Sequence, residues 1–223
     1  MRSFKDFICE GLHDPARHKA IFLLGGPGSG KSYIRDRTKG DLGFKSVDSD
    51  AAFEHAMKKH GLSLKMPEHE KEARDAIRTK AKETTAKRAA HWRNGRLGMM
   101  IDGTGRDHEQ IIKHSQHLRD LGYDTHAIFV NTSLHVAHHR NESRPRSVPR
   151  ETVEHSWHAA QNNLGKFQQH FGSDKMHIVD NNHPDENVIH RIHKKVRKIA
   201  TAPVTNPIAK QWEKEQIAKR TRS

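Results

Sequence analysis

The sequence predicts an α/β domain in which a five-stranded parallel sheet lies between two layers of helices, a three-layer sandwich. Five short apolar segments alternate along the chain with longer segments of helical character. The first apolar segment ends in glycine residues, which is typical of a buried strand that runs into a ligand-binding turn. A chain of 223 residues is long enough for one such domain with its own core.

The predicted strands are short, and their apolar side chains are nearly uninterrupted, as in sheets buried on both faces. They cover Ala20–Leu24, Phe44–Val47, Leu97–Ile101, Thr125–Val130 and Met176–Val179. The sequence does not predict their order in the sheet.

Helical segments fill the intervals between these strands. We expect them to begin at Gly30–Ser32 and to cover Ala51–His60, Glu68 to about Arg93, Asp107–Leu121, Leu134–Glu142, Arg150–Phe171 and a segment opened by Pro184 that carries Val188 to Ile199 at helical spacing. Pro203 and Pro207 mark a linker before a last polar helix or a tail. We therefore expect a domain over residues 1–200 and a basic C-terminal tail over 201–223.

The charge of the chain indicates a polyanionic partner. The formal net charge is +13, and the segment from His190 to Ser223 holds ten Lys or Arg against two Glu. Such an excess is most often found in proteins that bind nucleic acid, and DNA is the partner that we expect. The alternative is an effect on solubility without any partner.

The cellular compartment is predicted from sequence features that are absent. No apolar run is long enough to span a membrane, and Met1–Glu10 has no continuous apolar stretch of the kind found in signal peptides. Cys9 is the single cysteine, so no internal disulfide can form. We expect a cytoplasmic protein.

One glycine-rich motif predicts nucleotide binding. The segment Gly25–Ser32 matches the P-loop pattern G-x-x-x-x-G-K-[ST] and lies between a predicted strand and a predicted helix. Its backbone N–H groups and the helix N-terminus would bind the phosphates of ATP. Lys31 would reach the β- and γ-phosphates and Ser32 would bind Mg²⁺. The predicted ATP-binding residues are Gly26, Pro27, Gly28, Ser29, Gly30, Lys31 and Ser32, together with Arg140.

Acidic residues follow the second and third predicted strands, whose carboxyl ends should meet the phosphate site. A hydroxyl kinase needs a carboxylate that accepts the proton of the acceptor, and Asp50 is predicted for this role. Asp48 would position the acceptor or Mg²⁺, or else cap the next helix. Asp102 is predicted to lie beside Mg²⁺, and Thr104 and Arg106 to contact the acceptor, although a simple glycine turn is the alternative.

An arginine-rich segment after the fourth strand predicts a lid over about residues 134–150. Arg140 and Arg144 share one helix face and are predicted to neutralise charge on the migrating phosphoryl group. Arg146 is predicted to contact the substrate. A solvated basic helix face is the alternative interpretation.

These residues together resemble the zeta-toxin and polynucleotide-kinase-like group of P-loop kinases. The similar pieces are G-G-P-G-S-G-K-S at Gly25–Ser32, V-D-S-D at Val47–Asp50, I-D-G-T-G-R at Ile101–Arg106 and R-N-E-S-R-P-R at Arg140–Arg146. The resemblance implies that Asp50 is the base and that the lid arginines contact ATP. The stretch from Arg144 to Asn163 is also similar to bacteriophage kinases that phosphorylate 5-hydroxymethyluracil in DNA, which implies the cytoplasm of a bacterial host.

The favoured function is therefore an ATP- and Mg²⁺-dependent kinase of a hydroxyl group on nucleic acid, with 5-hydroxymethyluracil in DNA as acceptor. Three alternatives stay open: a polynucleotide 5′-hydroxyl kinase, a zeta-toxin-like kinase of a nucleotide sugar, and a non-enzymatic nucleic-acid-binding switch. The sequence does not predict the oligomeric state.

Overall fold

The computed structural model describes residues 14–39, 42–183 and 185–221, so the predictions for Met1–Glu10, Cys9 and Pro184 lie outside the described residues. Within them, the sheet has five parallel strands in the order β2-β3-β1-β4-β5, which confirms the predicted fold. The strands are β1 (Lys19–Leu24), β2 (Lys45–Val47), β3 (Met99–Gly103), β4 (Asp124–Asn131) and β5 (Met176–Asp180). Most of the predicted boundaries are correct to within two residues.

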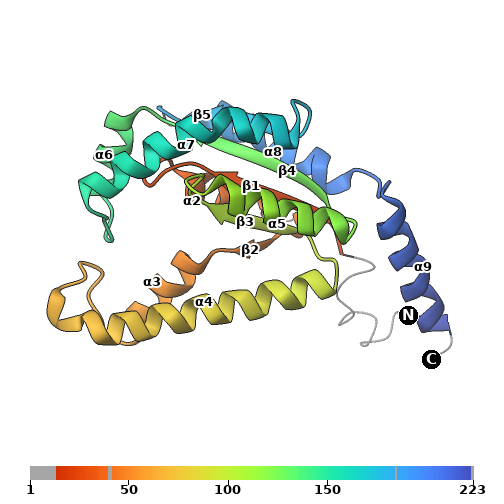
Figure 1. Ribbon diagram of the computed structural model, residues 1–223, viewed down its shortest axis with the longest axis horizontal. Helices are drawn as coiled ribbons and strands as arrows, with labels where there is room; N and C mark the ends of the chain where they lie inside the picture. Colours follow the sequence, from red (N-terminus) through yellow and green to blue (C-terminus); the bar gives the residue numbers. More distant parts are fainter. Residues whose placement is uncertain (1–13, 40–41, 184, 222–223) are drawn as a thin grey trace.

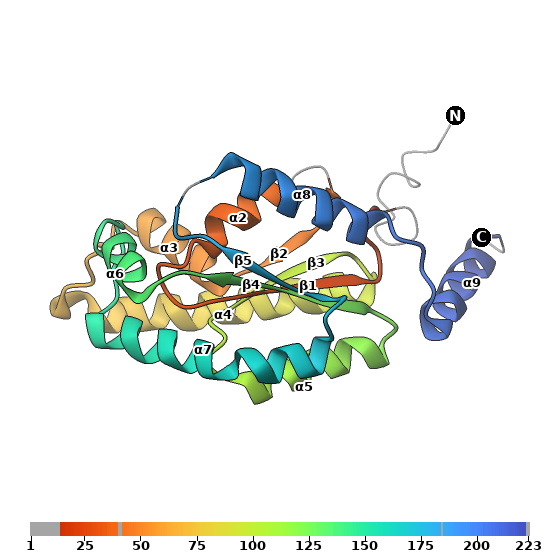
Figure 2. The same ribbon diagram turned by 90° about the horizontal axis from the view of Figure 1, so that it is seen from above.

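Helices cover both faces of the sheet (Figure 2). Alternate residues of β1 pack on each layer. On one face, Ile21 and Leu23 pack with α2 (Lys31–Thr38) and α8 (Glu186–Thr201). On the other face, Phe22 and Leu24 pack with α5 (His108–Asp120) and α7 (Arg150–Phe171). Because β1 is buried along its whole length, the glycine-rich turn that follows it has a fixed starting point.

A helical hairpin between β2 and β3 projects away from the sheet (Figure 1). It consists of α3 (Ser49–Lys59), a 3₁₀ turn η2 (Glu68–Glu70) and α4 (Lys71–Asn94). The two helices share a small apolar cluster formed by Phe53, Met57 and Ala81. Ala81 is the single buried residue of α4, so most of this long helix lies at the surface.

The predicted lid corresponds to α6 (Leu134–Glu142) and the following segment 143–149, which leads into α7. At the C-terminus, the expected helix or tail is a helix, α9 (Pro207–Thr221). It is docked on the opposite end of the sheet, where the Trp212 ring lies 5.3 Å from that of His18 and Glu213 pairs with Arg17. Within the described residues no helix is long and apolar enough to cross a membrane.

Candidate active site

The glycine-rich turn takes the backbone conformation that a phosphate-binding loop needs. Gly25, Gly28 and Gly30 have positive φ angles of 146°, 77° and 91°, which side chains other than glycine rarely adopt. The turn also packs closely against the lid. A Cβ atom at Gly28 would lie 2.2 Å from the carbonyl oxygen of Ala137 in α6, so only glycine fits there.

Lys31 begins α2 and folds back over the turn. Its buried Nζ atom donates to the carbonyl oxygens of Gly25 at 2.6 Å and Gly26 at 3.1 Å. Burial lowers the pKa of Lys31, while the carboxylate of Asp102 opposes this shift. The ammonium group therefore lies on the turn that is predicted to bind phosphates and can exchange carbonyl partners for phosphate oxygens.

Asp102 lies in β3 with one carboxylate oxygen, Oδ1, buried without a hydrogen-bond partner among the described residues. Burial raises the pKa of this carboxyl group, and the nearby Lys31 lowers it in part. Asp102 and the exposed Ser32 line the same cavity. An unpaired carboxylate oxygen beside a hydroxyl fits Mg²⁺, which takes one or two protein oxygens together with phosphate oxygens. Asp102 and Ser32 are thus the residues that would hold it.

Asp48 is used structurally in this arrangement. Its Oδ1 atom accepts from the backbone N–H groups of Asp50 at 2.9 Å and Ala51 at 3.1 Å, which caps α3. Its Oδ2 atom pairs with the buried Arg35 of α2. The helix-capping alternative for Asp48 is therefore present, and its predicted contact with the acceptor stays a prediction.

Asp50 stands at the first turn of α3 and is paired on both carboxylate oxygens. Oδ1 lies 3.1 Å from Nη2 of Arg78 in α4, and Oδ2 lies 3.1 Å from Nη2 of Arg146 in the lid. Burial alone would raise the pKa of Asp50, but Arg146 and then Arg78 lower it below its ordinary value of 3.8. Asp50 is ionised at neutral pH, and its pairing with the two arginines makes it a weaker proton acceptor in this arrangement.

The lid arginines differ in their partners. Arg146 is nearly buried and also donates from Nε to Glu54 of α3 at 2.8 Å, while Arg144 approaches the same carboxylate at 3.8 Å. Arg140 donates from Nη2 to the carbonyl oxygen of Asn182 at 3.4 Å. Its Nη1 atom is buried without a hydrogen-bond partner among the described residues, beside Gly30 of the turn. Arg140 therefore has a free donor aimed at the predicted phosphate site.

The loop after β3 is held by α7. Asn163 donates from Nδ2 to the carbonyl oxygens of Gly105 at 3.1 Å and Arg106 at 2.8 Å. Thr104 lines the cavity, but the exposed side chain of Arg106 does not. The predicted acceptor contact of Arg106 stays a prediction that this arrangement does not favour.

A cavity of about 490 Å³ brings these groups together between the turn, the α3–α4 hairpin and the lid. All the site residues predicted from the sequence line it except Gly26, Ser29 and Arg106. Arg35 and Glu54 also line it and were not predicted. Arg35 follows Lys31 by four residues on the same helix, a spacing that could have indicated it. Arg78 and Glu54 could not be found in this way, because their contacts depend on how the hairpin and the lid pack.

Asn181 is a further residue that the sequence analysis missed. It follows β5, is buried, and donates from Nδ2 to the carbonyl oxygen of Ser29 at 2.7 Å. This bond ties the glycine-rich turn to the loop between β5 and α8. Asn181 thus helps to hold the turn in place.

Comparison with known proteins identifies the family of this chain. The family model described as Zeta toxin matches residues 7–195. The chain belongs to the Zeta toxin family. A search of curated proteins finds no match to this sequence.

Solved structures of low sequence identity share the fold. A structure from the PezAT toxin–antitoxin system of Streptococcus pneumoniae is 16% identical with a TM-score of 0.55, and the alignment covers 97% of this chain and 91% of that one. A putative kinase from Chloroflexus aurantiacus is 16% identical with a TM-score of 0.53, covering 82% and 96%. A gluconokinase from Sinorhizobium meliloti is 14% identical with a TM-score of 0.50, covering 82% and 94%. The family and the fold together support an ATP-dependent P-loop kinase.

Proposed function

We propose that this protein transfers the γ-phosphate of ATP to a hydroxyl group on nucleic acid, with 5-hydroxymethyluracil in DNA as the favoured acceptor. The observation that supports transfer most strongly is the placement of Asp50 across one cavity from Lys31. A protein that only binds ATP as a switch has no need of a carboxylate opposite its phosphate loop.

Each residue of the cavity has a part in this reaction. Lys31 moves from the carbonyl oxygens of Gly25 and Gly26 to the β- and γ-phosphates. The free Nη1 donor of Arg140 binds the migrating phosphoryl group. The oxygen of the acceptor hydroxyl bonds to the γ-phosphorus while Asp50 accepts the proton of that hydroxyl. The bond between the γ-phosphorus and the oxygen that bridges it to the β-phosphate breaks, which leaves ADP. When bound at Asp102 and Ser32, Mg²⁺ supplies neutralisation of the phosphate charge.

The charge of the acceptor side supports nucleic acid. Helix α4 carries eight Lys or Arg against three Asp or Glu and buries only Ala81. It runs beside α3, which carries Asp50, and continues beneath the sheet, so part of this cationic helix lies next to the predicted transfer site (Figure 1). A polyanion bound along α4 would explain a net charge of +13 better than a small acceptor would.

A kinase of a nucleotide sugar is the second candidate. The Zeta toxin family match favours this candidate, because the resemblance of the chain to zeta toxins implies a nucleotide sugar as the acceptor. A small acceptor needs only arginines that line the cavity, such as Arg144 and Arg146, and leaves most of the charge of α4 without a role.

Transfer of labelled phosphate from ATP to a panel of acceptors tests the proposal. The panel holds DNA containing 5-hydroxymethyluracil, plain DNA with 5′-hydroxyl ends, and nucleotide sugars. We expect label on internal bases and a rate that falls steeply between 50 and 200 mM salt. Label on DNA ends indicates the polynucleotide kinase, and salt-insensitive label on the nucleotide sugar indicates the second candidate. ATP binding without transfer to any hydroxyl would contradict the kinase proposal itself.

A further inference from the structure

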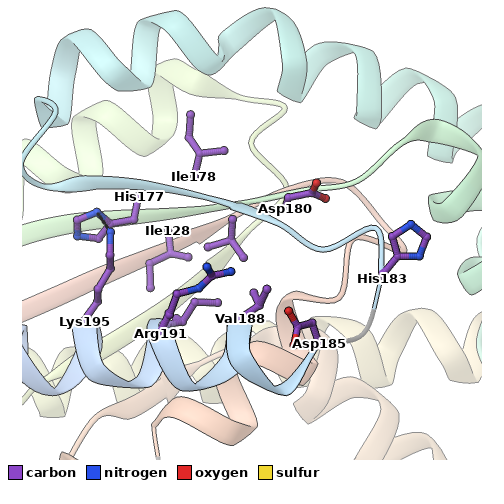
Figure 3. Close-up of a pocket in the computed structure, with 11 residues that line it drawn as sticks. Ile128, His177, Ile178, Asp180, His183, Asp185, Val188, Arg191 and Lys195 are labelled. Atoms are coloured by element: carbon purple, nitrogen blue, oxygen red, sulfur yellow. Dashed lines mark hydrogen bonds between the residues drawn. The ribbon is translucent and has the colours of Figure 1, made fainter.

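One edge of the sheet has no further strand beside it among the residues that the structure describes. β5 is the last strand of the order β2-β3-β1-β4-β5, and no ribbon crosses its outer side in the close-up (Figure 3). Edge strands are pairing templates unless they are covered or interrupted. The side chain of Ile178 stands exposed on this strand, with 47% of its surface accessible.

The register shows which backbone groups are free. Lys175 accepts from Ala127 of β4, and Asn181 donates to Asn131, so the odd-numbered residues of this stretch face β4. Ile178 and the N–H group of Asp180 therefore face outward. Among the described strands β5 pairs with β4 alone, so these outward groups have no strand partner there. These backbone groups are therefore available to form hydrogen bonds with an added strand.

A cavity of about 420 Å³ opens beneath this edge, between β5 and α8. Its inner wall is apolar and is formed by Ile128, Val179, Val188 and Ile192 (Figure 3). Alternate side chains of a strand laid along β5 would point into this cavity, because strand side chains alternate between faces. The cavity thus fits apolar side chains at every second position.

The rim of the cavity holds cations that lack carboxylate partners. Arg191 and Lys195 are exposed and lie four residues apart on α8, and neither forms an ion pair within the described part of the chain. Lys195 instead lies 3.3 Å from Nδ1 of His177. Burial and then Lys195 lower the pKa of His177, so this ring is neutral near pH 7.

The two acids of the same rim are already engaged. Asp180 accepts from the backbone N–H and the side-chain amide of Asn182 at 2.9 and 2.7 Å. Asp185 caps α8 by accepting from the backbone N–H of Asn187 at 2.8 Å. These hydrogen bonds come from neutral groups, so both carboxylates stay charged and balance Arg191 and Lys195 at the rim itself. The positive excess beside the cavity is that of α8 as a whole, which carries five Lys or Arg against one Glu and favours an anionic occupant.

We propose that β5 and α8 form a docking groove for an extended acidic segment of a partner protein. The segment adds a strand to the free edge at Ile178, places apolar side chains in the cavity, and sets acidic side chains beside Arg191 and Lys195. Main-chain pairing supplies affinity in this mode of recognition, and the pockets for alternate side chains supply specificity.

Selection from a display library of random eight-residue peptides tests the groove. The whole chain is the bait, and the double variant Arg191→Glu, Lys195→Glu is used for counter-selection. We expect enriched peptides in which Asp or Glu alternates with Val, Ile or Leu. A pool without acidic enrichment, or a selection that yields no saturable binder, overturns the proposal.

The best peptide is then synthesised and its affinity measured by fluorescence anisotropy. We expect the double variant to bind at least about tenfold more weakly, through loss of the charge pairs. The matched double variant Lys194→Glu, Lys198→Glu changes two exposed α8 residues outside the cavity and should bind within about twofold of wild type. Equal losses in both double variants would show a non-specific charge effect and contradict the groove.

N-methylation of the peptide separates strand pairing from simple charge attraction. Only alternate amides of an added strand face β5. We therefore expect methyl groups on one alternate set to abolish binding and methyl groups on the other set to leave it within about threefold. If both sets are tolerated, the segment does not pair with β5 and the proposal is wrong.

Discussion

Replacing Gly28 by alanine tests whether the glycine-rich turn is held by the lid. The added Cβ would lie 2.2 Å from the carbonyl oxygen of Ala137 and 2.9 Å from its Cα atom. Ordinary contacts begin near 3.4 Å, so the turn or α6 must move by about 1.2 Å. All of these Ala137 atoms belong to backbone, and no flexible side chain can yield instead.

Two contributions set the expected cost. The φ angle of 77° at Gly28 is left-handed, which costs a residue with a Cβ atom about 1–2 kcal/mol. Overpacking against a rigid neighbour costs a further 1–3 kcal/mol, roughly. We expect Gly28→Ala to lower the free energy of unfolding by about 2–5 kcal/mol. ATP affinity should fall as well, because either the phosphate-binding turn itself or α6, which carries Arg140, is displaced.

Urea unfolding measures this loss, and Gly165→Ala is the matched control. Gly165 lies inside α7, where an added Cβ would meet no atom within 4 Å. The same substitution there should stabilise the protein by about 0.5–1 kcal/mol. The reasoning fails if Gly28→Ala unfolds within about 0.5 kcal/mol of wild type while Gly165→Ala behaves as expected.

Three further predictions concern buried polar groups and pH. Burial, with nearby Arg96, lowers the pKa of His18 from 6.5 to about 4. Between these two pH values the unfolded chain binds a proton on His18 that the folded chain does not, so the free energy of unfolding falls as the pH drops from about 6.5 to 4. His18→Phe should remove up to about 3 kcal/mol of this loss when unfolding titrations at pH 7 and pH 4 are compared. Asn163→Leu leaves the carbonyl oxygens of Gly105 and Arg106 without this donor, and thermal unfolding should show a loss of about 1–3 kcal/mol. Arg146→Gln removes a cation that lowers the pKa of Asp50, so the acid limb of the pH profile of kcat/KM should move to higher pH. An acid limb that does not move would show that it does not report the titration of Asp50.

The sequence predicts the fold well because local patterns determine most of it. Buried parallel strands are continuous apolar runs, and Ala20–Leu24 lies wholly within β1. The glycine-rich turn is fixed by its own residues, since Gly28 and Gly30 need conformations that other residues avoid. The strand order depends on contacts between distant segments and carries no local pattern.

The site is predicted only in part, for the same reason. The P-loop residues and Asp102 are identified by their position at or just after the carboxyl end of a strand, which places them at one edge of the sheet. The pairing of Asp50 with Arg78 depends on how α4 packs on α3, and that packing rests on a small cluster around Phe53. The double role of Asp48 as helix cap and partner of Arg35 requires two elements to meet.

The single-turnover rate of phosphoryl transfer by Asp50→Asn tests the central claim most directly. This substitution keeps the shape of the side chain and removes its proton acceptor. We expect the rate to fall by about 10²- to 10⁴-fold, with ATP affinity within about threefold of wild type and a smaller loss in the matched variant Glu54→Gln. A rate for Asp50→Asn within about tenfold of wild type would contradict the assignment of Asp50 as the base.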